Sequence, residues 1–285
     1  MASFEDRYYN SADGLRLHYR DYPGGDPEQP PILCLPGLTR NARDFEPVAD
    51  RFAGEWRVLA LDFRGRGGSA PDPDPTRYRP SSYAADVLKL LDQLGIADAV
   101  FVGTSLGGLV TMLIAGQEDE RIAGALLNDI GPEVSPEGIE RIRTYVGKQV
   151  DFPSFAEAGR AMMARAGDVY PRWGEVEWER FARRCCREEG GRVSYDYDMA
   201  IAEPFASANE STQPNLWPLL EHLKGKPVTV LRGAHSDLFS VDVRMIAELG
   251  QSAELVTIPD VGHAPSFDEP ESIAAVERLL GRVTG

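Results

Sequence analysis

The chain has 285 residues, of which 42% are hydrophobic and 26% charged, and its formal net charge is −15 at pH 7. This composition excludes a disordered or fibrous protein and is typical of one globular α/β domain with an insertion. The acidic balance argues against nucleic acid and anionic membrane surfaces as partners, because both attract basic faces. We therefore expect a small-molecule substrate.

The N-terminal segment MASFEDRYYNSADG has no basic stretch followed by an apolar run. It therefore predicts no signal peptide and a cytoplasmic location. The three cysteines, Cys34, Cys185 and Cys186, lack the spacing of a disulfide framework or a metal site, and we expect reduced thiols. The uncharged residues 99–116 approach the length of a membrane helix, but four glycines interrupt them, which favours a buried strand, a turn and a buried helix.

Segments rich in aliphatic and β-branched residues predict strands at 16–22, 31–37, 56–63, 99–105, 124–131, 227–233 and 253–259. Amphipathic helical patterns lie between several of them. In residues 81–95 apolar side chains recur at helical spacing, with Ser81 or Ser82 as the expected cap. The alternation predicts an α/β fold with a mostly parallel central sheet flanked by helices.

The alternation stops between about Pro132 and Leu220, where aromatic and charged residues mix without strand-like runs. Residues 175–191, EVEWERFARRCCREEGG, predict a helix ended by glycines. The segment is too long for a loop. We therefore predict a helical cap at 133–220 inserted into a core of 1–132 and 221–285, lying over the carboxyl ends of the strands, where open α/β sheets bind ligands.

Residues 103–107, Gly-Thr-Ser-Leu-Gly, follow a predicted strand and precede a predicted helix. This is the G-x-S-x-G pattern and context of a nucleophile elbow, in which a tight turn exposes the serine hydroxyl. A serine hydroxyl needs a base to take its proton, and the base needs a third group to hold it. Ser105 is therefore a candidate nucleophile.

The partners are expected on loops after later strands. Asp237 follows the strand at 227–233 and His263 follows the strand at 253–259, which gives the order serine, acid, histidine. Asp129 also follows a strand and is a second candidate for the acid, although an aspartate before Pro132 also suits a turn. We predict catalytic Ser105, Asp237 and His263.

The other histidines fit a catalytic role less well. His18 lies in a strand and His222 precedes one, so both are expected to be structural or solvated. His235 precedes Asp237 instead of following it, which makes it a poor alternative base.

Two backbone amides are expected to form an oxyanion hole: that of Leu106, directly after the serine, and that of Leu38, in the loop after the strand at 31–37. Residues 65–70, GRGGSA, match a dinucleotide fingerprint, but PDPDP follows where a helix would have to begin, so we expect no nucleotide cofactor. No motif supports a metal.

These pieces resemble the α/β-hydrolase superfamily, in its branch of esterases, lactonases and carbon-carbon hydrolases with a helical cap. The resemblance rests on LPGLTRN (35–41), DFRGRGGS (62–69), GTSLGG (103–108), RGAHSD (232–237) and GHAPSFDEP (262–270), which together span nearly the whole chain outside the cap. It implies the α/β-hydrolase fold and a triad of Ser105, Asp237 and His263. Many relatives have His-Gly before the donor in the oxyanion loop, where this chain has Pro-Gly-Leu.

The leading hypothesis is a serine hydrolase that cleaves a small carboxylic ester or lactone through an acyl-enzyme and needs no cofactor. The alternative within the class is a carbon-carbon hydrolase of a ketonic acid, which requires cations in the cap for the substrate's carboxylate. A third possibility is a non-catalytic ligand-binding protein.

The cap supplies candidate pocket residues. Its aromatic residues are expected to line an apolar substrate pocket: Trp173, Trp178, Phe181, Tyr195, Tyr197 and Phe205. Four arginines between 180 and 187 are expected to be mostly solvated, because Trp178, Phe181 and Cys185 form the predicted buried stripe of the same helix. On these grounds neutral substrates are expected to be preferred to anionic ones.

Overall fold

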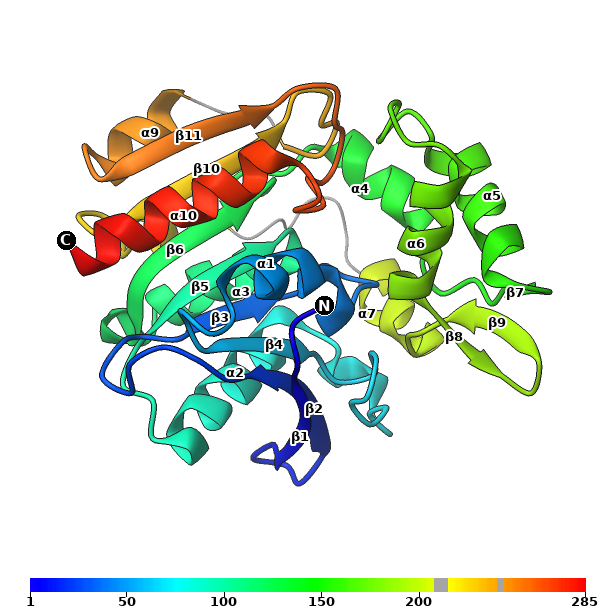
Figure 1. The fold of residues 1–285 in the computed structure, drawn as a ribbon, viewed down its shortest axis with the longest axis horizontal. Coiled ribbons are helices and arrows are strands. Elements are labelled where there is room, and N and C mark those ends of the chain that lie inside the picture. The colour runs from blue at the N-terminus through cyan, green and yellow to red at the C-terminus, as the bar shows by residue number, and fades with distance from the viewer. Residues whose placement is uncertain (208–214, 240–242) are drawn as a thin grey trace.

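An eight-stranded sheet runs through the computed structural model, which describes residues 1–207, 215–239 and 243–285, apart from the side chains of 205–207 and 243. The strand order is β1-β2-β4-β3-β5-β6-β10-β11 (Figure 1). The strands are β1 (Glu5–Asn10), β2 (Arg16–Tyr22), β3 (Ile32–Leu35), β4 (Val58–Asp62), β5 (Ala99–Thr104), β6 (Ile122–Asn128), β10 (Val228–Gly233) and β11 (Ala253–Ile258). β1 and β2 run antiparallel to their neighbours, and the other strands are parallel. The predicted fold class is confirmed.

Helices cover both faces of the sheet. One face is covered by α1 (Glu46–Phe52) and α10 (Pro270–Thr284), and the other by α2 (Pro80–Leu94), α3 (Leu106–Ala115), α8 (Trp217–Glu221) and α9 (Val243–Leu249). Short 3₁₀ turns lie at η1 (Ala42–Phe45), η2 (Pro75–Arg77), η3 (Asp119–Arg121) and η4 (Met199–Ile201). Every residue of β3 and β4 is buried, because each of these strands lies between two others and under helices on both faces.

All seven predicted strands are present in the eight-stranded sheet, and the eighth strand of that sheet, β1, was not predicted. Five of the six residues of β1 are exposed, so the strand lacks the apolar run that identified the others. The predicted cap of α2 is wrong. This helix begins at Pro80, whose missing backbone N–H and fixed φ suit the first helical position, and no side chain caps it.

The residues predicted as a helical cap contain strands as well as helices. Four helices, α4 (Pro136–Arg143), α5 (Phe155–Ala166), α6 (Glu175–Cys185) and α7 (Ala202–Ser207), accompany a small sheet of β7 (Asp151–Phe152), β8 (Cys186–Glu189) and β9 (Arg192–Tyr195). The helix expected to run to the glycines ends at Cys185. Gly190 and Gly191 instead form the turn of the β8–β9 hairpin, and their φ angles of 58° and 74° favour glycine. These elements lie beside the strand ends (Figure 1).

The uncharged stretch at 99–116 is divided as expected between β5, a turn at Ser105 and α3. In the described part of the chain no helix has the length and apolar character needed to cross a membrane.

Candidate functional site

Ser105 occupies a sharp turn between β5 and α3. Its φ of 50° and ψ of −110° lie outside the regions that non-glycine residues usually adopt. The turn needs glycines on both sides, because a Cβ at Gly103 would lie 2.6 Å from the Gly107 backbone and a Cβ at Gly107 would lie 2.0 Å from the carbonyl oxygen of Leu35. The G-x-S-x-G pattern therefore has a steric cause.

Replacing Gly107 with alanine should lower the free energy of unfolding by at least about 2 kcal/mol, because the new methyl group meets rigid backbone. Gly281→Ala in α10 is the matched control. Nothing lies within 4 Å of a Cβ at Gly281, so that change should stabilise the helix by up to about 1 kcal/mol. Urea unfolding of both variants measures the difference, and equal stabilities would contradict the steric explanation.

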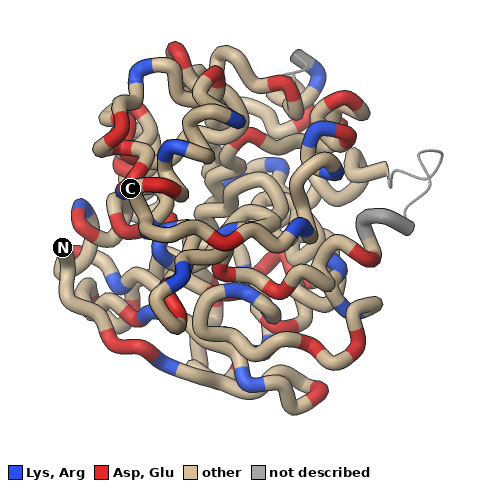
Figure 2. The backbone as a smooth tube through the Cα atoms, turned by 90° about the vertical axis from the view of Figure 1, so that its right-hand side faces the viewer, with Lys and Arg blue, Asp and Glu red and all other residues tan. Residues whose placement is uncertain are grey.

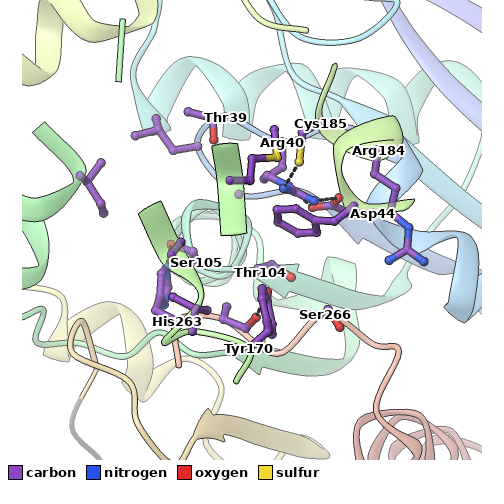
Figure 3. A pocket seen from close by; sticks show the side chains of 18 of the residues that line it. Thr39, Arg40, Asp44, Thr104, Ser105, Tyr170, Arg184, Cys185, His263 and Ser266 are labelled. Atoms are coloured by element: carbon purple, nitrogen blue, oxygen red, sulfur yellow. Dashed lines mark hydrogen bonds and ion pairs between the residues drawn. The ribbon is translucent and has the colours of Figure 1, made fainter. Parts of the chain in front are cut away.

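Three side chains form a hydrogen-bonded chain at the carboxyl ends of the strands. His263 Nε2 lies 3.0 Å from Ser105 Oγ, and His263 Nδ1 lies 2.6 Å from Asp129 Oδ2. The His263 side chain is 11% exposed and that of Asp129 is fully buried. Figure 3 shows Ser105 and His263 side by side at the cavity wall. We refer to these residues as the Ser105–His263–Asp129 chain.

Asp129 is held by donors from two directions. The backbone N–H of Gly233 donates to Oδ1 at 2.9 Å, and the hydroxyl of Ser236 donates to Oδ2 at 2.5 Å. These donors satisfy a carboxylate that is buried away from solvent. Ser236 was not recognised in the sequence, which gave Asp237 as the contribution of the loop after β10.

The prediction that Asp237 contacts His263 is wrong. Its carboxylate is 46% exposed and forms a two-pronged ion pair with Arg141, at 2.5 Å and 2.7 Å. The turn after β10 directs Ser236 toward Asp129 and Asp237 toward solvent. β6 lies directly beside β5, so Asp129, which follows β6, lies near the turn that holds Ser105, and His263 reaches Asp129 from the loop after β11.

The remaining histidines lie away from Ser105. His18 is buried and lies 2.7 Å from Asp62 and 3.0 Å from Asp6, so it is structural as expected. These carboxylates raise the pKa of His18 despite burial, which alone lowers it. His222 and His235 are exposed.

The loop after β3 lies next to the elbow. Gly37 and Leu38 line the same cavity as Ser105, and the carbonyl of Leu38 accepts a hydrogen bond from the buried Arg66 at 2.9 Å. Leu106 is the first residue of α3, so its amide has no acceptor within the helix. Both predicted oxyanion-hole residues therefore flank Ser105, and the direction of their N–H groups stays a prediction.

The glycine-rich residues 65–70 pack around the Asp62 carboxylate and the loop after β3. A Cβ at Gly67 would lie 2.2 Å from the Asp62 carboxylate, and the N–H of Gly68 donates to that carboxylate at 2.8 Å. Arg66, from the same segment, holds the loop that contains Leu38. As expected, no helix begins there.

A cavity of about 290 Å³ is lined by Ser105 and His263 together with residues of α4, α5, α6 and β9 (Figure 3). Of the predicted pocket residues, Trp178, Phe181 and Tyr195 line it, while Trp173 and Tyr197 do not. Trp173 stacks on Tyr170, with ring centroids 3.8 Å apart. Phe205 lies outside the residues whose side chains are described.

Aromatic residues that were not among the candidates also line the cavity, namely Tyr145, Tyr170 and Phe267. Tyr170 also has a positioning contact, because its hydroxyl donates to the carbonyl of Ala264 at 2.6 Å, next to His263. Spacing alone gave no signal for Tyr145 or Tyr170, since neither belongs to the helical stripe that was analysed.

Among the described residues, the charged side chains that line the cavity are those of Arg40, Arg141, Arg165 and Arg184 and one carboxylate, that of Asp44. The expectation that the 180–187 arginines are mostly solvated is wrong for Arg184, whose side chain is 7% exposed and pairs with Asp268 at 2.8 Å. It holds for Arg183 and Arg187, each more than half exposed. The cavity wall is therefore more cationic than its aromatic residues suggested.

The thiol of Cys185 lies at the same wall and contacts Arg40. Burial raises the pKa of Cys185 to about 11 and that of Cys186 to about 12, so both remain protonated at neutral pH. All three cysteines are free and buried, as expected.

Comparison with known proteins gives the class that the fold and site indicate. Residues 32–276 match the family model described as "Alpha/beta hydrolase family". The chain belongs to the α/β hydrolase family.

Individual relatives cover almost the whole chain. The chain is 35% identical to a 3-hydroxybutyrate-oligomer hydrolase of Cupriavidus necator, over 93% of this chain and 92% of that protein. It is 23% identical to 3-oxoadipate enol-lactonase 2 of Acinetobacter baylyi, over 95% and 96% of the two chains. The crystal structure of an alpha/beta hydrolase from Novosphingobium aromaticivorans superposes with a TM-score of 0.92, at 53% identity over 99% of both chains.

Proposed function

We propose that this protein hydrolyses a carboxylic ester or lactone through a covalent acyl-enzyme formed on Ser105. The observation that carries the proposal is the hydrogen-bonded chain in which His263 lies 3.0 Å from Ser105 Oγ and 2.6 Å from Asp129 Oδ2. A base within hydrogen-bond reach of a serine, itself held by a buried carboxylate, is the arrangement that activates a hydroxyl nucleophile.

In the proposed reaction Ser105 Oγ attacks the ester carbonyl while His263 Nε2 takes the hydroxyl proton. Asp129 orients the imidazole through Nδ1 and stabilises its charged form. The amides of Leu106 and Leu38 would stabilise the oxyanion of the tetrahedral intermediate. His263 then gives its proton to the leaving alkoxide, and water, activated by the same histidine, releases the acid and restores Ser105.

The relatives favour esters as the substrate class. The name of the Cupriavidus necator relative specifies an oligomer of a hydroxy acid, whose units are joined by ester bonds, and that of the Acinetobacter baylyi relative specifies an enol-lactone, which is a cyclic ester. The cavity arginines also suit the carboxylate of a ketonic acid, which keeps carbon-carbon hydrolysis as the second candidate.

A panel of purified substrates separates these functions. The panel contains a 3-hydroxybutyrate dimer, its methyl ester, a neutral aryl ester, a lactone and a ketonic ring-cleavage product. We expect the hydroxy-acid esters to be hydrolysed with the highest kcat/KM. Turnover of the ketonic acid alone would favour the second candidate, and tight binding without any turnover would favour a non-catalytic binding protein.

A further inference from the structure

Arg165 differs from the other three cavity arginines in its partners. The others each pair with a carboxylate, in Arg40–Asp44, Arg141–Asp237 and Arg184–Asp268. For Arg165, near the end of α5, no carboxylate lies within ion-pair distance among the described residues. Its side chain thus presents a positive charge to the cavity that the described part of the chain does not neutralise.

Two tyrosines support the Arg165 guanidinium. Its Nη1 donates to the hydroxyl of Tyr195 at 3.0 Å, and its central carbon lies 4.9 Å from the ring centroid of Tyr145. Because the Tyr195 oxygen accepts this hydrogen bond, its own proton remains available to donate. Burial raises the pKa of both phenols, so both stay protonated at neutral pH.

This arrangement matches the needs of a carboxylate ligand. The guanidinium has further N–H donors in a planar fork that fits two carboxylate oxygens, and the phenol adds one more donor beside it. Arg165, Tyr145 and Tyr195 come from the capping residues, whereas Ser105 and His263 come from the core, and all five line one cavity. A substrate that spans the cavity would contact both groups.

We propose that Arg165 and the Tyr195 hydroxyl bind a free carboxylate of the substrate, so that the ester cleaved at Ser105 belongs to a molecule that also has a carboxylate group. This inference rests on the proposed ester hydrolysis and names its substrate class: esters of hydroxy acids, or half-esters of dicarboxylic acids.

The inference reverses the preference for neutral substrates that the sequence suggested. That preference assumed an apolar pocket and outward arginines, but four arginines line the cavity and Arg165 lies outside the 180–187 run. The net charge of −15 repels anions at long range, but salt screens that field over distances beyond about 10 Å. Arg165 is itself exposed, and it would act on a carboxylate through direct contact, where its N–H donors add to the charge. Figure 2 shows acidic and basic positions intermixed along the described backbone.

The test compares kcat/KM for a hydroxy-acid ester that ends in a free carboxylate with kcat/KM for its methyl ester. Wild-type protein should prefer the free acid. Arg165→Gln should lower kcat/KM for the acid by about 10- to 100-fold, mainly through KM, and leave the methyl ester within about twofold. Arg165→Lys keeps the charge but loses the planar fork. Its kcat/KM for the free acid should lie between those of wild type and Arg165→Gln.

Arg160→Gln is the matched control on the same helix. Arg160 is exposed, pairs with Glu157 and does not line the cavity, so this variant should retain the preference. An unchanged preference in Arg165→Gln, or a wild-type preference for the methyl ester, would overturn the inference while leaving ester hydrolysis intact.

Failure of the proposed function gives a different result, in which neither compound is hydrolysed. Titration calorimetry with the intact acid and its methyl ester then tests the carboxylate site directly. Tighter binding of the acid to wild type but not to Arg165→Gln supports the site, and equal binding to both proteins contradicts it.

Discussion

Replacing Ser105 with alanine should lower kcat for ester hydrolysis by roughly 10⁴- to 10⁶-fold, because only the nucleophile is removed and no other group can form the acyl-enzyme. The melting temperature should change little, since the replacement is smaller than serine and the strained turn is enforced by the flanking glycines. Steady-state kinetics and thermal unfolding measure both effects.

Ser81→Ala is the control for this substitution. Ser81 is exposed in the first turn of α2, so its removal should leave kcat unchanged. If Ser105→Ala retained hydrolysis near the wild-type rate, Ser105 would not be the nucleophile.

Replacing Asp129 with asparagine should lower kcat by roughly 10³- to 10⁴-fold. The amide can still accept from Gly233 at one atom, but its NH₂ group would face the donors of Ser236 and His263 at the other, and the charge that stabilises the imidazolium would be lost. The same change at Asp237 should alter kcat by no more than about threefold, because it weakens an exposed ion pair of small energetic value.

The two variants, assayed side by side, identify the acid. Each variant changes one carboxylate to an amide of the same shape. Positions 129 and 237 therefore differ in their burial and in their contact with His263, not in the chemistry of the substitution. A larger loss of kcat in Asp237→Asn than in Asp129→Asn would identify Asp237, in the loop after β10, as the acid.

The fold was predictable because its determinants are local and repeated. Short runs of strand-forming residues identified seven strands, and the glycines around Ser105 identified the elbow through a steric requirement that the structure makes explicit. β1 was missed because its side chains are mostly exposed. The β8–β9 hairpin was missed because its charged strands continue the pattern of α6, and a glycine pair suits either a helix end or a hairpin turn.

The position of the acid could not be settled from chain order. Asp129 and Asp237 both follow strands and both lie between Ser105 and His263 in the sequence. The difference arises from the sheet order, which puts β6 between β5 and β10, and from the turn that directs Ser236 inward and Asp237 outward. Sheet order and the direction of a turn belong to the tertiary structure, and residue spacing in the sequence does not determine them.

The lining of the cavity was only partly predictable for a similar reason. Arg184 belongs to a charged run that normally remains solvated, but Asp268 lies opposite it and makes burial possible. Arg165 has no local signal at all, because its importance depends on which carboxylates approach it in three dimensions.

The most direct test of the account is covalent labelling with a fluorophosphonate, followed by peptide mapping. The phosphorus should bond to Ser105 Oγ with loss of fluoride, giving one label on the peptide that contains Ser105. Labelling should be absent in Ser105→Ala, strongly slowed in Asp129→Asn and unchanged in Asp237→Asn. A label on another residue, or equal labelling of wild type and Ser105→Ala, would contradict the assignment of Ser105 as the activated nucleophile.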